Sequence, residues 1–199
     1  MRLFIAVDID QRVRREIDQI QRGLRQKTGL LKGPVKWVEP NLIHLTLKFL
    51  GQVPDQSITQ ICRLTEETAQ SHSAFEIRVQ GLGTFGRPPR VLWAGIEDCP
   101  ALATLQKDLE ERLEKAGWPR EERAFSAHLT LCRIKEAKAG IQLGQAVEGQ
   151  HLRTLGSVPI EQMIVYESQL QSGGPVYTAV ARYDLKKTGS PLTNRGANP

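Results

Sequence analysis

Two kinds of hydrophobic pattern alternate along the chain. In residues 11–27 and 100–116, apolar side chains recur every three or four positions, which places them on one face of an amphipathic helix. In residues 42–50 and 127–134, apolar and polar side chains alternate, which indicates strands with one buried face. The expected helices cover residues 11–27, 55–70, 100–116 and 140–149, and the expected strands cover residues 3–9, 42–50, 75–82, 91–97, 127–134, 158–167 and 175–185.

The order of these elements repeats. A helix, a strand that contains a histidine, a second helix and two strands occur in residues 11–97, and the same order returns in residues 100–185. This repetition predicts an α+β fold with two similar lobes related by a pseudo-two-fold, packed as a single domain over residues 1–185. Residues 186–199 are polar and contain Gly, Pro and Asn, so we expect a flexible C-terminal tail.

The composition is that of a folded domain. Of the 199 residues, 40% are hydrophobic, which is enough to form a core at this length. No stretch approaches the roughly 18 apolar residues of a membrane span, and the first apolar run is too short for a secretory signal, so we expect no membrane association. The cysteines, Cys62, Cys99 and Cys132, are odd in number and far apart, which favours a reducing cytoplasm. The net charge of +5 gives only a weak preference for anionic partners.

One tetrapeptide occurs twice. His44-Leu-Thr-Leu returns unchanged at His128, 84 residues later, and each copy lies in an expected strand. Because side chains alternate across a strand, His44 and Thr46 share one face, and so do His128 and Thr130. The leucines on the opposite face can pack against a helix, whereas the polar face needs water or a ligand.

The chemistry that suits two histidines and two threonines is displacement at phosphorus. One neutral imidazole removes a proton from the attacking water, while the other imidazole, protonated, gives a proton to the leaving oxygen. The threonine hydroxyls can donate hydrogen bonds to the phosphate oxygens. A single His-x-Thr on a strand is usually structural, so the hypothesis rests on the repetition. A metal site is a weaker interpretation, because no carboxylate or cysteine stands at ligand spacing. The other histidines, His72 and His151, lie in polar stretches and are expected at the surface.

The repeated motifs resemble those of the 2H phosphoesterase superfamily, in particular its RNA 2′,3′-cyclic phosphodiesterase branch, historically called 2′-5′ RNA ligase. The resemblance extends over about residues 1–185. It rests on His44-Leu-Thr-Leu-Lys-Phe-Leu-Gly51, Phe125-Ser-Ala-His-Leu-Thr-Leu-Cys-Arg133, Arg2-Leu-Phe-Ile-Ala6, Trp37, Gly81 to Trp93, Tyr166-Glu-Ser-Gln-Leu170 and Gly174-Pro-Val-Tyr177. One departure is Ala127, where the family often has proline before the second histidine.

The resemblance implies a bilobal α+β fold, in which two antiparallel sheets line a central cleft and the helices lie outside. It also implies hydrolysis of RNA 2′,3′-cyclic phosphate ends, tRNA fragments among them, to 2′-phosphates, with no metal and no ATP. His44 would be the proton donor and His128 the proton acceptor, and Thr46 and Thr130 would hold the phosphate. The reverse reaction would join RNA ends. The alternatives are a phosphoesterase acting on a small cyclic or 2′-5′-linked nucleotide, and an RNA-end binding module with little turnover. We expect a monomer.

Three further residues are candidates for substrate binding. The resemblance to the family makes Arg133 a plausible phosphate contact. Strict alternation along the strand would place its side chain on the other face of the sheet from His128. Lys48 shares the His44 face by the same alternation and could reach a neighbouring phosphate. Phe49 could stack on a base at the edge of the cleft, or belong to the core.

Overall fold

The computed structural model describes residues 1–31, 33–172 and 174–187. In this part of the chain, the helices and strands are β1 (Arg2–Asp8), α1 (Gln11–Thr28), β2 (Val35–Trp37), β3 (His44–Gln52), α2 (Asp55–Ser71), β4 (Phe75–Phe85), β5 (Val91–Ile96), α3 (Pro100–Lys115), β6 (His128–Ile134), α4 (Ala137–Ala146), β7 (Thr154–Ile160), β8 (Gln162–Gln171) and β9 (Gly174–Asp184).

The strands form one curled antiparallel sheet. Its order is β7-β4-β5-β6-β3-β1-β8-β9, and β2 pairs with the free part of β6. The expected α+β fold is therefore confirmed, and the two expected sheets are the two halves of one sheet. They join where Leu45 of β3 pairs with Leu129 of β6, the only residue pair of that ladder in the described residues.

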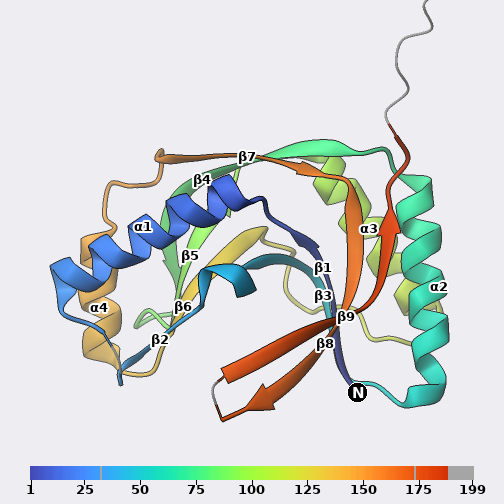
Figure 1. Cartoon of the computed structure of the whole chain (residues 1–199), viewed down its shortest axis with the longest axis horizontal. Helices are drawn as coiled ribbons and strands as arrows, with labels where there is room; N and C mark the ends of the chain where they lie inside the picture. Colours follow the sequence, from blue (N-terminus) through green and yellow to red (C-terminus); the bar gives the residue numbers. More distant parts are fainter. Residues whose placement is uncertain (32, 173, 188–199) are drawn as a thin grey trace, which may run out of the picture.

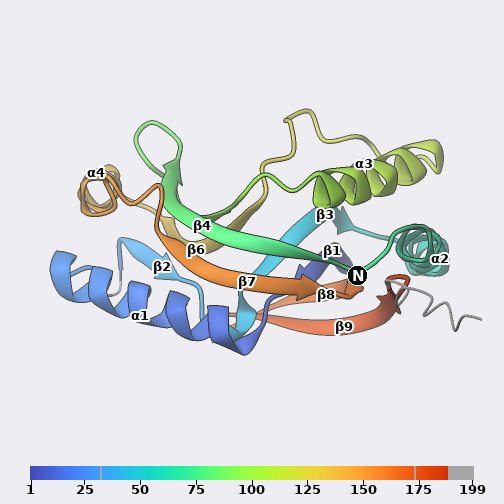
Figure 2. The same cartoon turned by 90° about the horizontal axis from the view of Figure 1, so that it is seen from above.

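Each half of the sheet carries its own pair of helices. We call β1, β3, β8 and β9 with α2 and α3 the first lobe, and β4 to β7 with α1, α4 and β2 the second lobe. Helices α2 and α3 lie at one end of the molecule and α1 and α4 at the other, as Figure 1 and Figure 2 both show.

The lobes do not correspond to the two halves of the sequence. Strands β4 and β5 follow β3 along the chain but pair with β6 and β7, whereas β8 and β9 follow β6 but join β1. The two expected lobes are therefore present, but each contains strands from both halves of the sequence, because β4 and β5 pair with β7 and β6, and β8 pairs with β1.

Two details of the predicted elements also change. The single strand expected over residues 158–167 is the end of β7 and the start of β8, with Glu161 between them. Lys186, the first residue of the expected tail, is paired with the folded part of the chain: its backbone bonds to His72 and Ala74 and forms a bridge with Ser73. Residues 188–199 of that expected tail lie outside the described residues.

Both strands that contain the histidines have a bulge at the same place. In β3, Thr46 pairs with Ala6 and Lys48 with Ile5, so Leu47 is an extra residue. In β6, Thr130 pairs with Trp93 and Cys132 with Leu92, so Leu131 is the extra residue. A bulge reverses the alternation of side chains beyond it. Positions 48 and 132 therefore turn to the helix side of the sheet, and positions 49 and 133 turn to the side of the histidines.

A buried glutamine from a helix supports each bulge. Gln21 of α1 donates from Nε2 to the Leu131 carbonyl at 3.0 Å and to the Val38 carbonyl at 2.8 Å. Gln106 of α3 donates to the Leu47 carbonyl at 3.4 Å. Both side chains are buried. The Leu131 carbonyl also accepts from the Val38 N–H at 2.9 Å, so Gln21 is its second donor. Because buried carbonyls need hydrogen-bond partners, each glutamine helps to stabilise the bulged strand.

Gln21→Met keeps most of the side-chain volume and removes the donor to both carbonyls. We expect it to lower the free energy of unfolding by about 1–3 kcal/mol, measured by urea denaturation, because the Val38 carbonyl loses its donor and the Leu131 carbonyl keeps only the Val38 N–H. Gln19→Met on the exposed side of the same helix is the control and should change stability by less than about 0.5 kcal/mol. Equal effects of the two substitutions would contradict the role given to Gln21.

Candidate active site

The two His-x-Thr pairs lie side by side at the junction of the lobes. Leu45 and Leu129 are opposite each other and fully buried on the helix side. The residues next to them therefore point to the other side, and the antiparallel register sets His44 beside Thr130 and Thr46 beside His128. Side chains in such positions lie roughly 5 Å apart at Cβ. Residues 84 positions apart in the sequence thus form one polar group around the pseudo-two-fold.

Both histidines are oriented by the same hydrogen bond. His44 Nδ1 lies 2.8 Å from the Leu42 carbonyl, and His128 Nδ1 lies 2.7 Å from the Ser126 carbonyl, two residues earlier in each case. A carbonyl only accepts hydrogen bonds, so Nδ1 is the protonated nitrogen in each ring. Each Nε2 is left free of hydrogen bonds to the described residues, and it can accept a proton or, once protonated, donate one.

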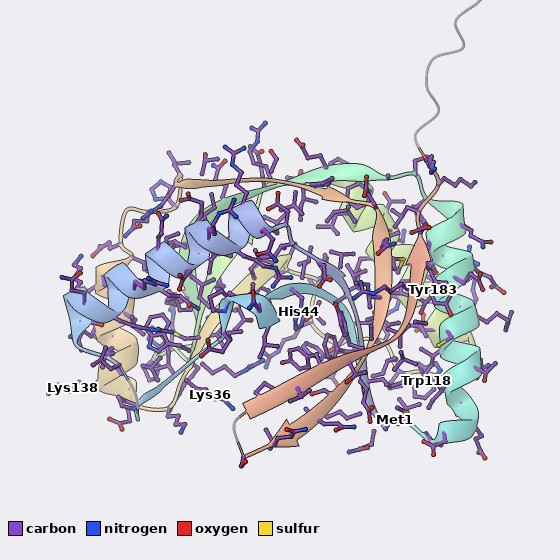
Figure 3. All side chains as sticks on the ribbon, viewed as in Figure 1. Met1, Lys36, His44, Trp118, Lys138 and Tyr183 are labelled. Atoms are coloured by element: carbon purple, nitrogen blue, oxygen red, sulfur yellow. The ribbon has the colours of Figure 1, made fainter. Side chains whose placement is uncertain are left out.

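Aromatic rings surround His44. Phe4 stacks on its imidazole with ring centroids 4.7 Å apart, and Tyr177 meets it edge-on at 5.3 Å. Burial among these rings lowers the pKa of His44, because it disfavours the imidazolium; the hydrogen bond to Leu42 and the charge of Asp8 act in the opposite direction. His44 is the labelled side chain at the centre of Figure 3.

Asp8 is the acidic residue that faces His44 from β1, where the two residues are paired. Its carboxylate accepts a hydrogen bond from the Tyr166 hydroxyl at 2.9 Å, and it lies 3.7 Å from Arg14 and 3.6 Å from Arg182. Burial, together with Asp8, raises the pKa of Tyr166 to about 12. The tyrosine therefore remains a hydrogen-bond donor, and Asp8 stays fixed beside His44.

The surroundings of His128 are more open. Phe85 meets its ring edge-on at 4.9 Å, and Trp93 lies next to Phe85 at 5.3 Å. A pocket beside His128 is lined by these rings, by Ser126 and by His151, among others. His151 was expected at the surface; it is exposed, and it borders this pocket.

Lys48 does not lie on the His44 face, contrary to the prediction from alternation. The bulge at Leu47 turns it to the helix side, where its side chain is 3% exposed. Its ammonium pairs with Glu110 of α3 at 2.5 Å and donates to the Pro119 carbonyl at 2.7 Å. The charge is therefore already paired inside the first lobe.

Arg133 and Phe49 occupy equivalent positions in the two strands, each two residues after the extra leucine of the bulge. Phe49 pairs with Phe4 and is 57% exposed, so it belongs to the His44 face and not to the core. Arg133 is exposed on the His128 face, where strict alternation would not place it. Both side chains can therefore reach a ligand bound at the histidines.

Phe4, Asp8, Tyr166 and Tyr177 were not among the candidate site residues, although Phe4, Tyr166 and Tyr177 lie in segments that carry the family resemblance. The alternation of residues 2–8 could have shown that Phe4 and Asp8 share one strand face. Nothing in the local pattern shows that this face meets His44, because the contact depends on the pairing of β1 with β3. The two tyrosines come from β8 and β9, more than 120 residues away in the sequence.

Comparisons with known proteins agree with this geometry. A family model described as the 2′-5′ RNA ligase superfamily matches residues 9–167. The RNA 2′,3′-cyclic phosphodiesterase of Methanothermobacter thermautotrophicus is 32% identical over 187 residues, which cover 93% of this chain and 99% of that protein. The protein of the same name from Archaeoglobus fulgidus is 34% identical over 180 residues, which cover 89% of this chain and 96% of that protein.

Solved structures give the same result. TT0787 of Thermus thermophilus superposes with a TM-score of 0.77 at 26% identity, covering 95% of this chain and 100% of that chain. The E. coli LigT complex with 3′-AMP superposes with a TM-score of 0.74 at 26% identity, covering 92% and 97%.

The fold and the paired His-x-Thr strands are those of a 2H phosphoesterase. Within that class, the chain belongs to the 2′-5′ RNA ligase superfamily. Among the described residues, no three His, Cys, Asp or Glu side chains come together in a way that could hold a metal ion. In the same part of the chain, no helix is long and apolar enough to cross a membrane.

We expect the buried pair of Lys48 and Glu110 to contribute to the free energy of unfolding. Lys48→Met removes the charge that balances the buried Glu110 carboxylate, which keeps only neutral donors from Gln106 and the Glu121 N–H, and we expect a loss of about 3–5 kcal/mol in urea denaturation. Arg63→Met breaks the exposed pair with Glu67 and should cost less than about 1 kcal/mol. The double variant Lys48→Met/Glu110→Leu should be more stable than the sum of the single variants predicts; strict additivity would contradict the coupling of the two charges.

The burial of His44 predicts a lowered titration midpoint for its imidazole. In ¹H–¹⁵N spectra of the imidazoles, assigned with His44→Gln, the midpoint of His44 should lie below 6.5. The pKa of His44 is lower in the folded protein than in the unfolded chain, so the unfolded chain binds the proton more strongly. The contribution of neutral His44 to the free energy of unfolding is therefore fully present above pH 6.5. That contribution is lost as the pH falls towards the lower folded pKa. Inorganic phosphate should raise the midpoint, because a bound anion favours the imidazolium. A midpoint at or above 6.5 in the free protein would refute the desolvation of this ring.

Proposed function

We propose that the protein hydrolyses RNA 2′,3′-cyclic phosphate ends to 2′-phosphates by acid–base catalysis with two histidines and without a metal ion. The observation that carries the proposal is the pair of His-x-Thr strands joined at Leu45 and Leu129, with both Nδ1 atoms bound to carbonyls and both Nε2 atoms free of bonds to the described residues. The curated relatives named RNA 2′,3′-cyclic phosphodiesterase support this substrate, and so does the E. coli LigT structure that contains 3′-AMP.

The reaction is an in-line displacement at phosphorus. A water oxygen forms a bond to phosphorus while the bond from phosphorus to the ribose 3′-oxygen breaks. His128 Nε2 takes the proton of the water, and His44 Nε2 gives a proton to the 3′-oxygen. The products are a 2′-phosphate and a 3′-hydroxyl. Each histidine ends in the opposite protonation state, and exchange with solvent restores both.

The threonines hold the phosphate during this step. The hydroxyls of Thr46 and Thr130 lie on the same face as the imidazoles, where they can donate to the non-bridging oxygens as charge develops. The role of His44 as proton donor requires the substrate, since burial lowers the pKa of its imidazole and so favours the neutral form. The negative charge of the bound phosphate favours the imidazolium, so substrate binding prepares the acid.

The same displacement can use an alcohol in place of water. A 5′-hydroxyl that attacks the cyclic phosphate, again with departure of the 3′-oxygen, forms a 2′-5′ linkage and needs no ATP. The pocket lined by Phe85 and Trp93 beside His128 favours this second activity, because aromatic rings can contact the nucleoside that carries the hydroxyl. We also propose that the enzyme acts as a monomer in the cytoplasm.

The test is a reaction followed by phosphorus NMR. A short RNA with a 2′,3′-cyclic phosphate end is incubated with the protein in EDTA, and conversion to a 2′-phosphate is expected. His44→Ala and His128→Ala should each lower kcat about 10²–10⁴-fold, because each removes a proton-transfer group. The control is His72→Ala, whose ring pairs with Asp108 between α2 and α3. The pH–rate profile of the wild type should be bell-shaped.

Several results would contradict the proposal. Conversion to a 3′-phosphate would reverse the leaving group, and a flat profile from about pH 5 to 9 would exclude two titrating histidines. Loss of activity in EDTA that Zn²⁺ or Mn²⁺ restores would indicate a metal-dependent hydrolase. Tight binding of a 2′-phosphate end without turnover would favour a binding module, and hydrolysis restricted to small nucleotides would favour the other phosphoesterase alternative.

A further inference from the structure

A buried ion pair lies where β3 meets the loop that leads to β6. This loop, residues 116–127, connects α3 to the strand of His128, and we call it the α3–β6 segment (Figure 2). Lys48 of β3 and Glu110 of α3 form the pair, and their side chains are 3% and 8% exposed. An apolar pair of similar volume is often as stable, because the desolvation of two charges offsets their attraction. What distinguishes this pair is its contact with the backbone of the segment.

The pair binds the α3–β6 segment at two points. The ammonium donates to the Pro119 carbonyl at 2.7 Å, and Glu110 Oε1 accepts a hydrogen bond from the Glu121 N–H at 2.8 Å. The other carboxylate oxygen accepts from Gln106, which also donates to the Leu47 carbonyl at the bulge of β3. One carboxylate therefore joins β3, α3 and the segment.

The α3–β6 segment has few other hydrogen bonds. In the described part of the chain, the backbone of residues 119–126 forms three, with the side chains of Lys48, Glu110 and His128. The third is the bond between His128 Nδ1 and the Ser126 carbonyl. Both backbone anchors that precede this carbonyl are thus supplied by the buried pair.

Apolar packing does not replace these anchors. Phe125 and Ala127 lie on either side of Ser126 and pack against the core. Such contacts hold the segment close to the sheet, but they are non-directional and do not fix how a carbonyl points. The direction matters at Ser126, because its carbonyl keeps the proton of neutral His128 on Nδ1. With that proton on Nε2, the imidazole could not accept a proton from water at that atom.

We propose that Lys48 and Glu110 are positioning residues for His128. By anchoring the α3–β6 segment to β3, they hold the Ser126 carbonyl where it keeps Nε2 of His128 free to accept a proton. The inference rests on the proposed function, in which this nitrogen takes the proton of the attacking water. The tautomer itself can be measured without a substrate.

His44 is supported independently of the buried pair. The Leu42 carbonyl that binds its Nδ1 belongs to a short 3-10 helix, Pro40–Leu42. Arg14 of α1 donates to the Pro40 carbonyl of that helix. In the described residues, the buried pair forms no hydrogen bond with this helix. The tautomer of His44 is therefore an internal reference that should not depend on the pair.

The experiment compares two neutral replacements of the pair. Lys48→Met/Glu110→Leu, the leucine variant, removes both anchors. Lys48→Met/Glu110→Gln, the glutamine variant, retains an amide oxygen that can accept from the Glu121 N–H. In ¹H–¹⁵N spectra recorded above the titration of the imidazoles, His128 should carry its proton on Nδ1 in the wild type and the glutamine variant. In the leucine variant the proton should shift towards Nε2, while His44 stays unchanged in all three proteins.

Turnover should follow the tautomer. With an RNA that ends in a 2′,3′-cyclic phosphate, kcat should fall about 10–10²-fold in the leucine variant and less in the glutamine variant, because a displaced catalytic group reacts more slowly. KM should change less than kcat, and the loss should persist at every pH, since a change of tautomer is not a titration. The control is Arg63→Met, which breaks the exposed pair with Glu67 on α2 and should change neither kcat nor the tautomers.

The outcomes separate the inference from the proposed function. An unchanged His128 tautomer in the leucine variant, or equal effects of the two variants, would overturn the positioning role while leaving the hydrolase intact. If the wild type does not hydrolyse the RNA, the proposed function fails, and the tautomers still decide the positioning role.

A measurement on the wild type covers the case in which neither variant folds. The Glu121 amide should exchange its hydrogen at least about tenfold more slowly than the Glu122 amide, which has no hydrogen-bond partner in the described residues. Equal exchange of the two amides would refute the anchor.

Discussion

The site depends on a break in the alternation of the two strands that carry the histidines. In each strand the leucine that follows the His-Leu-Thr segment, Leu47 or Leu131, has no partner in its ladder, and the residues directly after it change sides. This exchange brings Phe49 and Arg133 to the face of the histidines and moves Lys48 and Cys132 to the helix side. The bulges persist because Gln21 and Gln106 donate hydrogen bonds to the carbonyls at those positions from within the core. The two leucines and the two glutamines therefore control what a ligand meets beyond the threonines.

The pseudo-two-fold gives the protein a symmetric centre and unequal surroundings. At the centre, the two histidines share a tautomer, a carbonyl partner two residues earlier and a threonine neighbour on the opposite strand. Around it, His44 is enclosed by Phe4 and Tyr177, whereas His128 faces an open pocket. Burial disfavours the imidazolium of His44, so the proposed role of His44 as the acid depends on the negative charge of a bound phosphate.

Several ion pairs hold the framework of the site. Lys48 pairs with Glu110 inside the first lobe, and Arg14 and Arg182 lie near Asp8, which faces His44. Lys36 and Arg133 are paired across β2 and β6 and form no ion pair in the described residues. The net charge of +5 is thus less informative than the places of the charges. Affinity for an anionic polymer depends on where charge is concentrated and not on the sum over the chain.

The amino-acid sequence by itself determined most of the helices and strands and identified the candidate catalytic residues. Periodicity predicted α1, α3, β3 and β6 within a few residues, since helices and half-buried strands bury one face at fixed spacing. The repeated His-Leu-Thr-Leu identified His44, Thr46, His128 and Thr130, because alternation within one short strand needs no tertiary information. Tertiary structure alone decided which strands are neighbours, and hence that β8 and β9 return to β1 and bring Tyr166 and Tyr177 to His44. It also decided the sides of Lys48, Phe49 and Arg133, because a bulge is stabilised by a distant glutamine and by the register of a partner strand. Neither of those leaves a trace in the local pattern of hydrophobic and polar residues.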